Sequence, residues 1–95
     1  MEIFTIRDSK ANAYLTPFFS PTSAVAIRSC LSAMQEEGHQ FRVHVEDFSL
    51  YRIGSYDDDT GRITADDPEI VSNLVDLIPI NSEEIEPSLP LKGVA

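Results

Sequence analysis

Basic and aromatic residues are interleaved in the first 56 residues, and that combination of side chains can bind a nucleic acid. The residues concerned are Arg7, Lys10, Arg42, Arg52, Tyr14, Tyr51 and Tyr56. Bases of a single strand stack on exposed aromatic rings at about 1–3 kcal/mol each, while Arg and Lys hold the phosphates. These seven residues are therefore a candidate site for single-stranded DNA. The alternative is that the aromatic rings fill the core and the basic side chains form an ordinary solvated surface.

The charge is unevenly distributed along the chain. Of the 95 residues, 16 are acidic and seven are basic, which gives a net charge of −9. Residues 1–56 contain five bases and six acids, whereas residues 57–95 contain two bases, ten acids and no aromatic residue. Because DNA binding needs clustered Lys and Arg to neutralise phosphates, a DNA site must be a local patch on residues 1–56.

Other kinds of chemistry find little support in the spacing. Cys30 is the only cysteine and, with His39 and His44, falls short of the four ligands of a zinc site. The sequence identifies no general base near Cys30 that would activate its thiol as a nucleophile. Residues 57–61 faintly resemble a calcium loop, but that pattern would put Tyr56 at the first ligand position. We favour a hairpin turn there, with a weak cation site as the alternative, and expect no enzyme, no metal and no cofactor.

The size of the chain favours self-association. One domain of 95 residues has a small core, which rarely supplies more than about 3–5 kcal/mol of stability. A disulfide within the chain is excluded because there is one cysteine, so we expect a homodimer. No run approaches the roughly 18–20 apolar residues that cross a membrane, and the N-terminus lacks the basic region of a signal peptide. We therefore expect a cytoplasmic protein.

The strongest predicted element is a helix over residues 21–37. Ser20 would cap this helix and Pro21 would occupy its first position. Phe19 would pack on Ala24 as a hydrophobic staple. The predicted apolar stripe consists of Ala24, Ile27, Leu31 and Met34.

The other apolar segments predict strands and turns. The predicted strands are residues 1–7, 41–45 and 48–56, with one more at residues 62–64. Residues 57–61 predict a hairpin loop with Gly61 at positive φ. Residues 66–69 look like a helix start, and we favour a helical turn at 73–78, with a strand at 70–72 as the alternative.

This order of elements predicts an α+β domain, residues 1–78, in which one helix packs on a small antiparallel sheet. Residues 79–95 form an acidic, Pro-containing C-terminal tail that we expect to be mobile. Its residues Glu83, Glu84, Ile85 and Glu86 are candidates for binding a protein partner.

Three stretches, taken in order, resemble a viral family. They are residues 4–11 (FTIRDSKA), 15–22 (LTPFFSPT) and 46–57 (EDFSLYRIGSYD), the last followed by Thr60 and Gly61. Together they resemble the small nonstructural protein of gokushoviruses, which are single-stranded DNA phages of the microvirus group. Val45 stands where that family usually has Pro, and Phe48 where it usually has Tyr.

The resemblance implies a phage protein that is absent from the virion and works in the host bacterial cytoplasm. It implies a role in genome replication or in the switch to single-stranded genome synthesis, with single-stranded DNA as the partner. It defines no site residues. The alternative, favoured by the charge of −9, is a protein–protein adaptor that acts on the phage replication initiator or a host replication protein without touching DNA.

Overall fold

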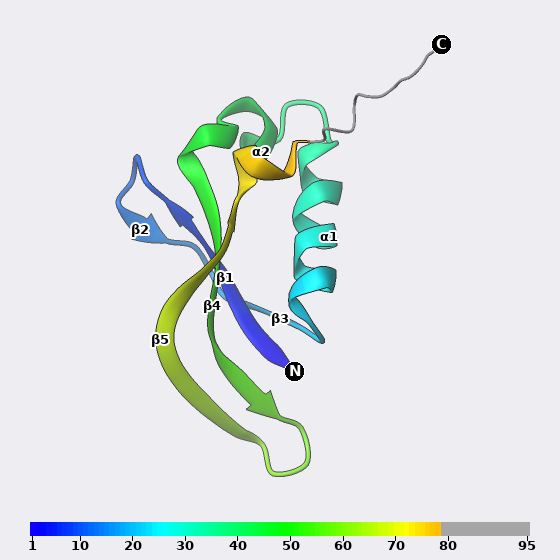
Figure 1. Cartoon of the computed structure of the whole chain (residues 1–95), viewed down its shortest axis with the longest axis vertical. Helices are drawn as coiled ribbons and strands as arrows, with labels where there is room; N and C mark the ends of the chain where they lie inside the picture. Colours follow the sequence, from blue (N-terminus) through cyan, green and yellow to red (C-terminus); the bar gives the residue numbers. More distant parts are fainter. Residues whose placement is uncertain (79–95) are drawn as a thin grey trace.

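Three long antiparallel strands form the centre of the computed structural model, which describes residues 1–78 (Figure 1). β1 (Glu2–Asp8) pairs with β4 (Phe48–Asp57), and β4 pairs with β5 (Arg62–Asn73). On its other edge β1 pairs with two short strands, β2 (Ala13–Tyr14) and β3 (Phe18–Ser20). The strand order is β2-β1-β4-β5, with β3 also beside β1. The fold is mixed α and β, as predicted, although β2 and β3 were not foreseen.

The helix α1 (Ser23–Met34) is shorter at both ends than the sequence predicts. Thr22 is its N-cap, and the Thr22 hydroxyl accepts the N–H of Val25 at 3.2 Å. The predicted cap, Ser20, is wrong: it is buried at the end of β3, where its hydroxyl donates to the carbonyl of Thr22 at 3.3 Å. The pairing of β3 with β1 therefore delays the start of the helix.

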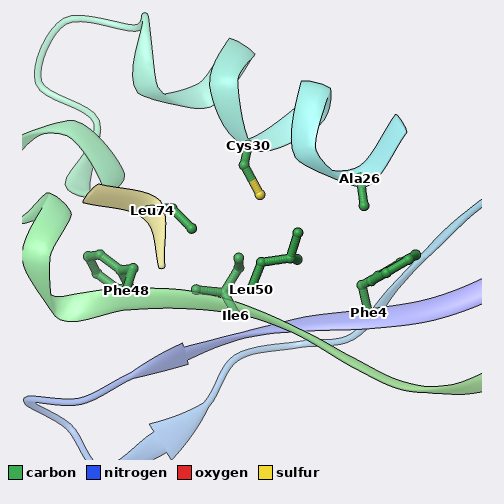
Figure 2. Packing of buried hydrophobic residues seen from close by; sticks show 7 residues of the cluster. All are labelled: Phe4, Ile6, Ala26, Cys30, Phe48, Leu50 and Leu74. Carbon is green, nitrogen blue, oxygen red and sulfur yellow. The ribbon is translucent and has the colours of Figure 1, made fainter. Parts of the chain in front are cut away.

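Small side chains bring α1 close to the sheet. Figure 2 shows Ala26 and Cys30 pointing from the helix towards the buried side chains of β1 and β4. The residues beneath them, with one from the chain after β5, are Phe4, Ile6, Phe48, Leu50 and Leu74. The predicted stripe is partly wrong, because Ile27 and Met34 pack against this core but Ala24 is exposed. Burial raises the pKa of the Cys30 thiol to about 11.

The predicted strand at residues 41–45 is wrong. This segment forms the short helix α2 (Gln40–Val43) and the 3₁₀ turn η1 (Val45–Asp47). The Nδ1 atom of His39 caps α2 by accepting the N–H of Phe41 at 3.0 Å. Phe41 and Val45 both pack against the core, and their spacing of four suits a helix as well as a strand. The apolar pattern of so short a segment cannot separate the two.

The chain after the hairpin loop continues as one long strand. The loop at 57–61 is confirmed: Gly61 has φ 76°, and the Asp57 carboxylate accepts the N–H groups of Asp59 and Thr60. The predicted helix start at 66–69 is wrong because these residues lie in β5, at an irregularity in its pairing with β4. The alternative strand at 70–72 and the helical turn are confirmed, the turn as η2 (Leu74–Leu77). The predicted tail, residues 79–95, lies outside the described residues.

The described part of the molecule is elongated, measuring 52 × 31 × 20 Å. Its radius of gyration is 15.7 Å, whereas a compact chain of this length would have about 12 Å. The difference arises because the β4–β5 hairpin extends well past the end of α1 (Figure 1). Within residues 1–78, no helix is long and apolar enough to cross a membrane.

Candidate nucleic-acid interface

The face of the sheet away from α1, which we call the outer face, carries much of the predicted site. Side chains alternate between the two faces of a strand. Because Phe4 and Ile6 point towards α1, Thr5 and Arg7 point to the outer face. The register of the sheet places Tyr51 opposite Thr5 and Tyr14 opposite Arg7, so all four residues share this face.

Arg7, Tyr14 and Tyr51 form one cluster on the outer face. The Arg7 guanidinium carbon lies 5.8 Å from the centre of the Tyr14 ring. The rings of Tyr14 and Tyr51 are 5.5 Å apart and nearly perpendicular, at 84°. Arg7 also donates a hydrogen bond to the side chain of Asn12, in the turn that joins β1 to β2. A cation beside two partly exposed rings can contact a phosphate and a base at once.

The outer face is hollowed beside this cluster. Two adjoining hollows, about 450 and 250 Å³ in volume, share Pro17, Ile53 and Ala65 and together form what we call the outer trough. Its other lining residues are Ile3, Thr5, Tyr14, Leu15, Phe19, Ile63, Thr64, Asp66 and Pro68. Thr5 fixes one wall, since its hydroxyl donates to the carbonyl of Leu15 at 2.7 Å.

Gly54 brings the two long strands together beneath the trough. A Cβ atom on Gly54 would lie 2.3 Å from the carbonyl oxygen of Thr64 on β5. Only glycine allows so close an approach of two backbones. The neighbouring irregularities in the pairing of β4 with β1 and β5 contribute to the bend of the sheet.

Tyr56 lies at the other end of the trough, beside Phe19. Their rings are 5.4 Å apart at 79°, and the N-terminal ammonium of Met1 donates to the Tyr56 carbonyl at 3.0 Å. Phe19 is 48% exposed, so it is not the helix staple that the sequence predicts. Phe18 stacks on Phe4 in the core instead, at 6.0 Å. Consecutive residues of a strand face opposite ways. Two adjacent phenylalanines in a strand therefore indicate that one of the two rings lies outside the core.

Arg52 is apart from the cluster. Its register with Phe4 puts it on the side of the sheet that faces α1, where it donates to Glu2 and, at 2.9 Å, to Asp66. These hydrogen bonds to Glu2 and Asp66 raise the pKa of Arg52 further above its usual value. Two carboxylates thus already neutralise this charge.

The two remaining basic residues of the predicted site, Lys10 and Arg42, lie in different parts of the molecule. Lys10 lies in the turn after β1, next to the cluster, and its backbone N–H donates to the Asp8 carboxylate at 3.0 Å. Arg42 lies on α2, where it reaches the carbonyl of Gln35 at 3.5 Å. The structure thus brings together Arg7, Tyr14 and Tyr51, with Lys10 nearby, while Arg42, Arg52 and Tyr56 lie elsewhere. The candidate partner-binding residues 83–86 lie outside the described residues.

The comparisons with known proteins give one match. No curated protein and no solved structure matches the chain. A family model described as "Phage ORF5 protein" matches residues 1–77. That range includes every strand and helix described above, together with the cluster and the outer trough. The chain therefore belongs to the phage ORF5 protein family.

Proposed function

We propose that this phage protein binds single-stranded DNA in the host bacterial cytoplasm, during viral genome replication or the switch to single-stranded genome synthesis. The family match supports a phage protein. The narrower assignment to the gokushovirus group of microviruses rests on the resemblance of the three sequence stretches alone.

The observation that carries the proposal is the cluster of Arg7, Tyr14 and Tyr51 at the end of an open trough. The two tyrosines supply flat surfaces on which bases stack, and Arg7 supplies the cation for the backbone. The trough beside them is lined mostly by carbon atoms, which suits the faces of bases better than phosphates. We expect little sequence preference, because every base has a face that can stack.

The charges set how salt affects this binding. Arg7 in the cluster and Lys10 next to it are the basic residues that can reach the strand, so about two phosphates are neutralised. For two phosphate contacts with a single strand, the logarithm of the binding constant falls with the logarithm of the salt concentration with a slope of about −1.4. A fourfold rise in salt therefore weakens binding by about sevenfold. The acidic character of the rest of the chain keeps the affinity low.

The test is fluorescence anisotropy of a labelled strand of about 30 nucleotides, with the full chain at about 50 and about 200 mM salt. Tyr14→Ala is expected to weaken binding by about tenfold, since one stacked ring contributes about 1–3 kcal/mol. Arg7→Glu is expected to weaken binding by about as much, since it removes the cation that holds a phosphate. Arg28→Glu is the matched control, because Arg28 is exposed on α1, away from the outer face. Equal affinities for all four proteins would refute the proposal.

The second candidate is the adaptor function. The carbon-lined trough and the net charge of −9 favour it, because an acidic chain attracts basic proteins and repels DNA. The candidate partners are the phage replication initiator and a host replication protein. Binding of the purified initiator that Ile53→Asp abolishes, with no DNA binding by the unmodified chain, would favour this candidate over the first.

A further inference from the structure

The end of the sheet that extends past α1 is apolar and open to solvent. Ile63 is 63% exposed and Phe19 is 48% exposed, and both line the trough. A two-stranded hairpin that extends from its domain is at best marginally stable in water. Exposed apolar patches of this kind in small proteins mark binding surfaces. The helix covers one face of the sheet, and in residues 1–78 nothing covers this part of the other.

The two ends of the outer face carry opposite charges. Arg7 and Lys10 lie at one end, beside the start of β4. At the other end Asp57 is the last residue of β4, and Asp58 and Asp59 follow it in the loop between β4 and β5. The surface between them is the carbon-lined trough. One end of the outer face thus carries Arg7 and Lys10, and the middle is apolar. At the other end three aspartates outnumber Arg62 and the N-terminal ammonium, so the net charge there is negative.

We propose that a second copy of this chain docks on the outer face, antiparallel to the first, about a twofold axis over the middle of the trough. A face with one positive end and one negative end is complementary to itself when one copy is rotated by half a turn. In this arrangement the hairpin of each copy packs in the partner copy's trough. The loop carboxylates of Asp58 and Asp59 then meet Arg7 and Lys10 of the other copy, and the pairing occurs twice.

The area of the face is sufficient for a stable dimer. Standard interfaces bury about 800 Å² on each partner. In the view down the shortest axis α1 lies beside the sheet (Figure 1), so the outer face spans the longest and the shortest dimensions of the molecule, 52 and 20 Å. Among the described residues, Asp66 is the one charged residue that lines the trough, and it is paired with Arg52; the other lining residues are uncharged, as is usual at the centre of an interface. The opposite charges at the rim set the orientation of the two copies.

This docking goes beyond the proposed function and holds whether or not the chain binds DNA. It covers Arg7, Tyr14 and Tyr51, so a second copy and a DNA strand would compete for the same end of the face. The dimer is then the form that carries no DNA.

The test is the mass of the full chain in solution without DNA, by light scattering across a range of concentrations up to about 100 µM. The expected mass is twice the 10.6 kDa of one chain. Ile63→Asp is expected to give monomers, with at least a tenfold weaker dimer. Val43→Asp is the matched control and should remain dimeric, since Val43 is equally open, at 57%, but lies on α2.

The orientation is tested by exchanging charges. Arg7→Glu with Lys10→Glu should weaken the dimer, and so should Asp58→Lys with Asp59→Lys. Combining all four changes should restore it, because the complementary pairs are rebuilt with their signs exchanged. Lys10, Asp58 and Asp59 are exposed and Arg7 is half-buried on the outer face, so folding should survive. A monomer at every concentration, an Ile63→Asp protein that is still dimeric, or failure of the combined variant to recover would each overturn the proposal.

Discussion

Arg52 and Tyr51 are neighbours in the sequence but lie on opposite faces of the sheet. Arg52 joins the first strand to β5 through Glu2 and Asp66. We expect Arg52→Gln to lower the melting temperature, because both carboxylates lose their partner. The same change should leave affinity for single-stranded DNA unaltered, since this charge lies away from the cluster. Thermal unfolding and anisotropy measured on one preparation check both parts, and a large loss of DNA affinity would contradict the second.

Cys30 gives a dependence of stability on pH. Its pKa is about 11 in the folded chain, against 9.0 for a free thiol. Between these two values the unfolded chain has lost the thiol proton while the folded chain keeps it, so the free energy of unfolding falls as the pH rises. Urea unfolding at a series of pH values from about 8 to about 11 should show this fall, and Cys30→Ala should remove the part due to the thiol. The Cys30→Ala protein will be less stable overall, so the slope against pH is the quantity to compare.

The same burial slows the chemistry of the Cys30 thiol. Only the thiolate reacts readily with disulfide reagents, and Cys30 is 3% exposed. At neutral pH the folded chain should therefore react far more slowly than the chain unfolded in urea. Equal rates would show that α1 separates from the sheet on the timescale of the assay.

At the scale of the elements, the contact of β4 with β5 at Gly54 controls the shape of the outer face. A Cβ at this position would meet the Thr64 backbone at 2.3 Å, so Gly54→Ala must push the strands apart. We expect a loss of about 1–3 kcal/mol in the free energy of unfolding, the usual range for overpacking. Gly61→Asn is the control, since Gly61 has open space around it and Asn tolerates positive φ. Urea unfolding of the two variants would contradict this if Gly61→Asn lost more.

Local residues were sufficient to predict some elements and not others. The hairpin loop was predictable because Asp57 and Gly61 specify it within five residues. The segment at 41–45 was not, because Phe41 and Val45 fit a helix and a strand equally well. The short strands β2 and β3 depend on pairing with β1, which lies outside the local pattern. The same limit holds for the site: Tyr14 and Tyr51 meet only through the register of the sheet.

At the scale of the whole molecule, the sheet has two apolar faces and one long helix. The helix covers the face that holds Phe4 and Leu50, and within residues 1–78 the other face is open along the hairpin. The unequal extension of helix and sheet explains why the radius of gyration exceeds that of a compact chain. A partner for the outer face, as in either proposal above, would supply contacts that residues 1–78 do not provide for themselves.

Within residues 1–78, β5 is an edge strand of the sheet, and its outer edge bears on how far such a protein can polymerise. Unpaired strand edges are the usual route to fibres, since each added chain exposes a new edge. This edge contains Pro68, which has no N–H to offer, flanked by Asp67 and Glu69. Two such edges repel each other, so growth of the sheet from chain to chain is disfavoured. The face-to-face docking proposed above would instead form a closed pair, because a twofold contact uses the same surface of both copies and leaves none for a third.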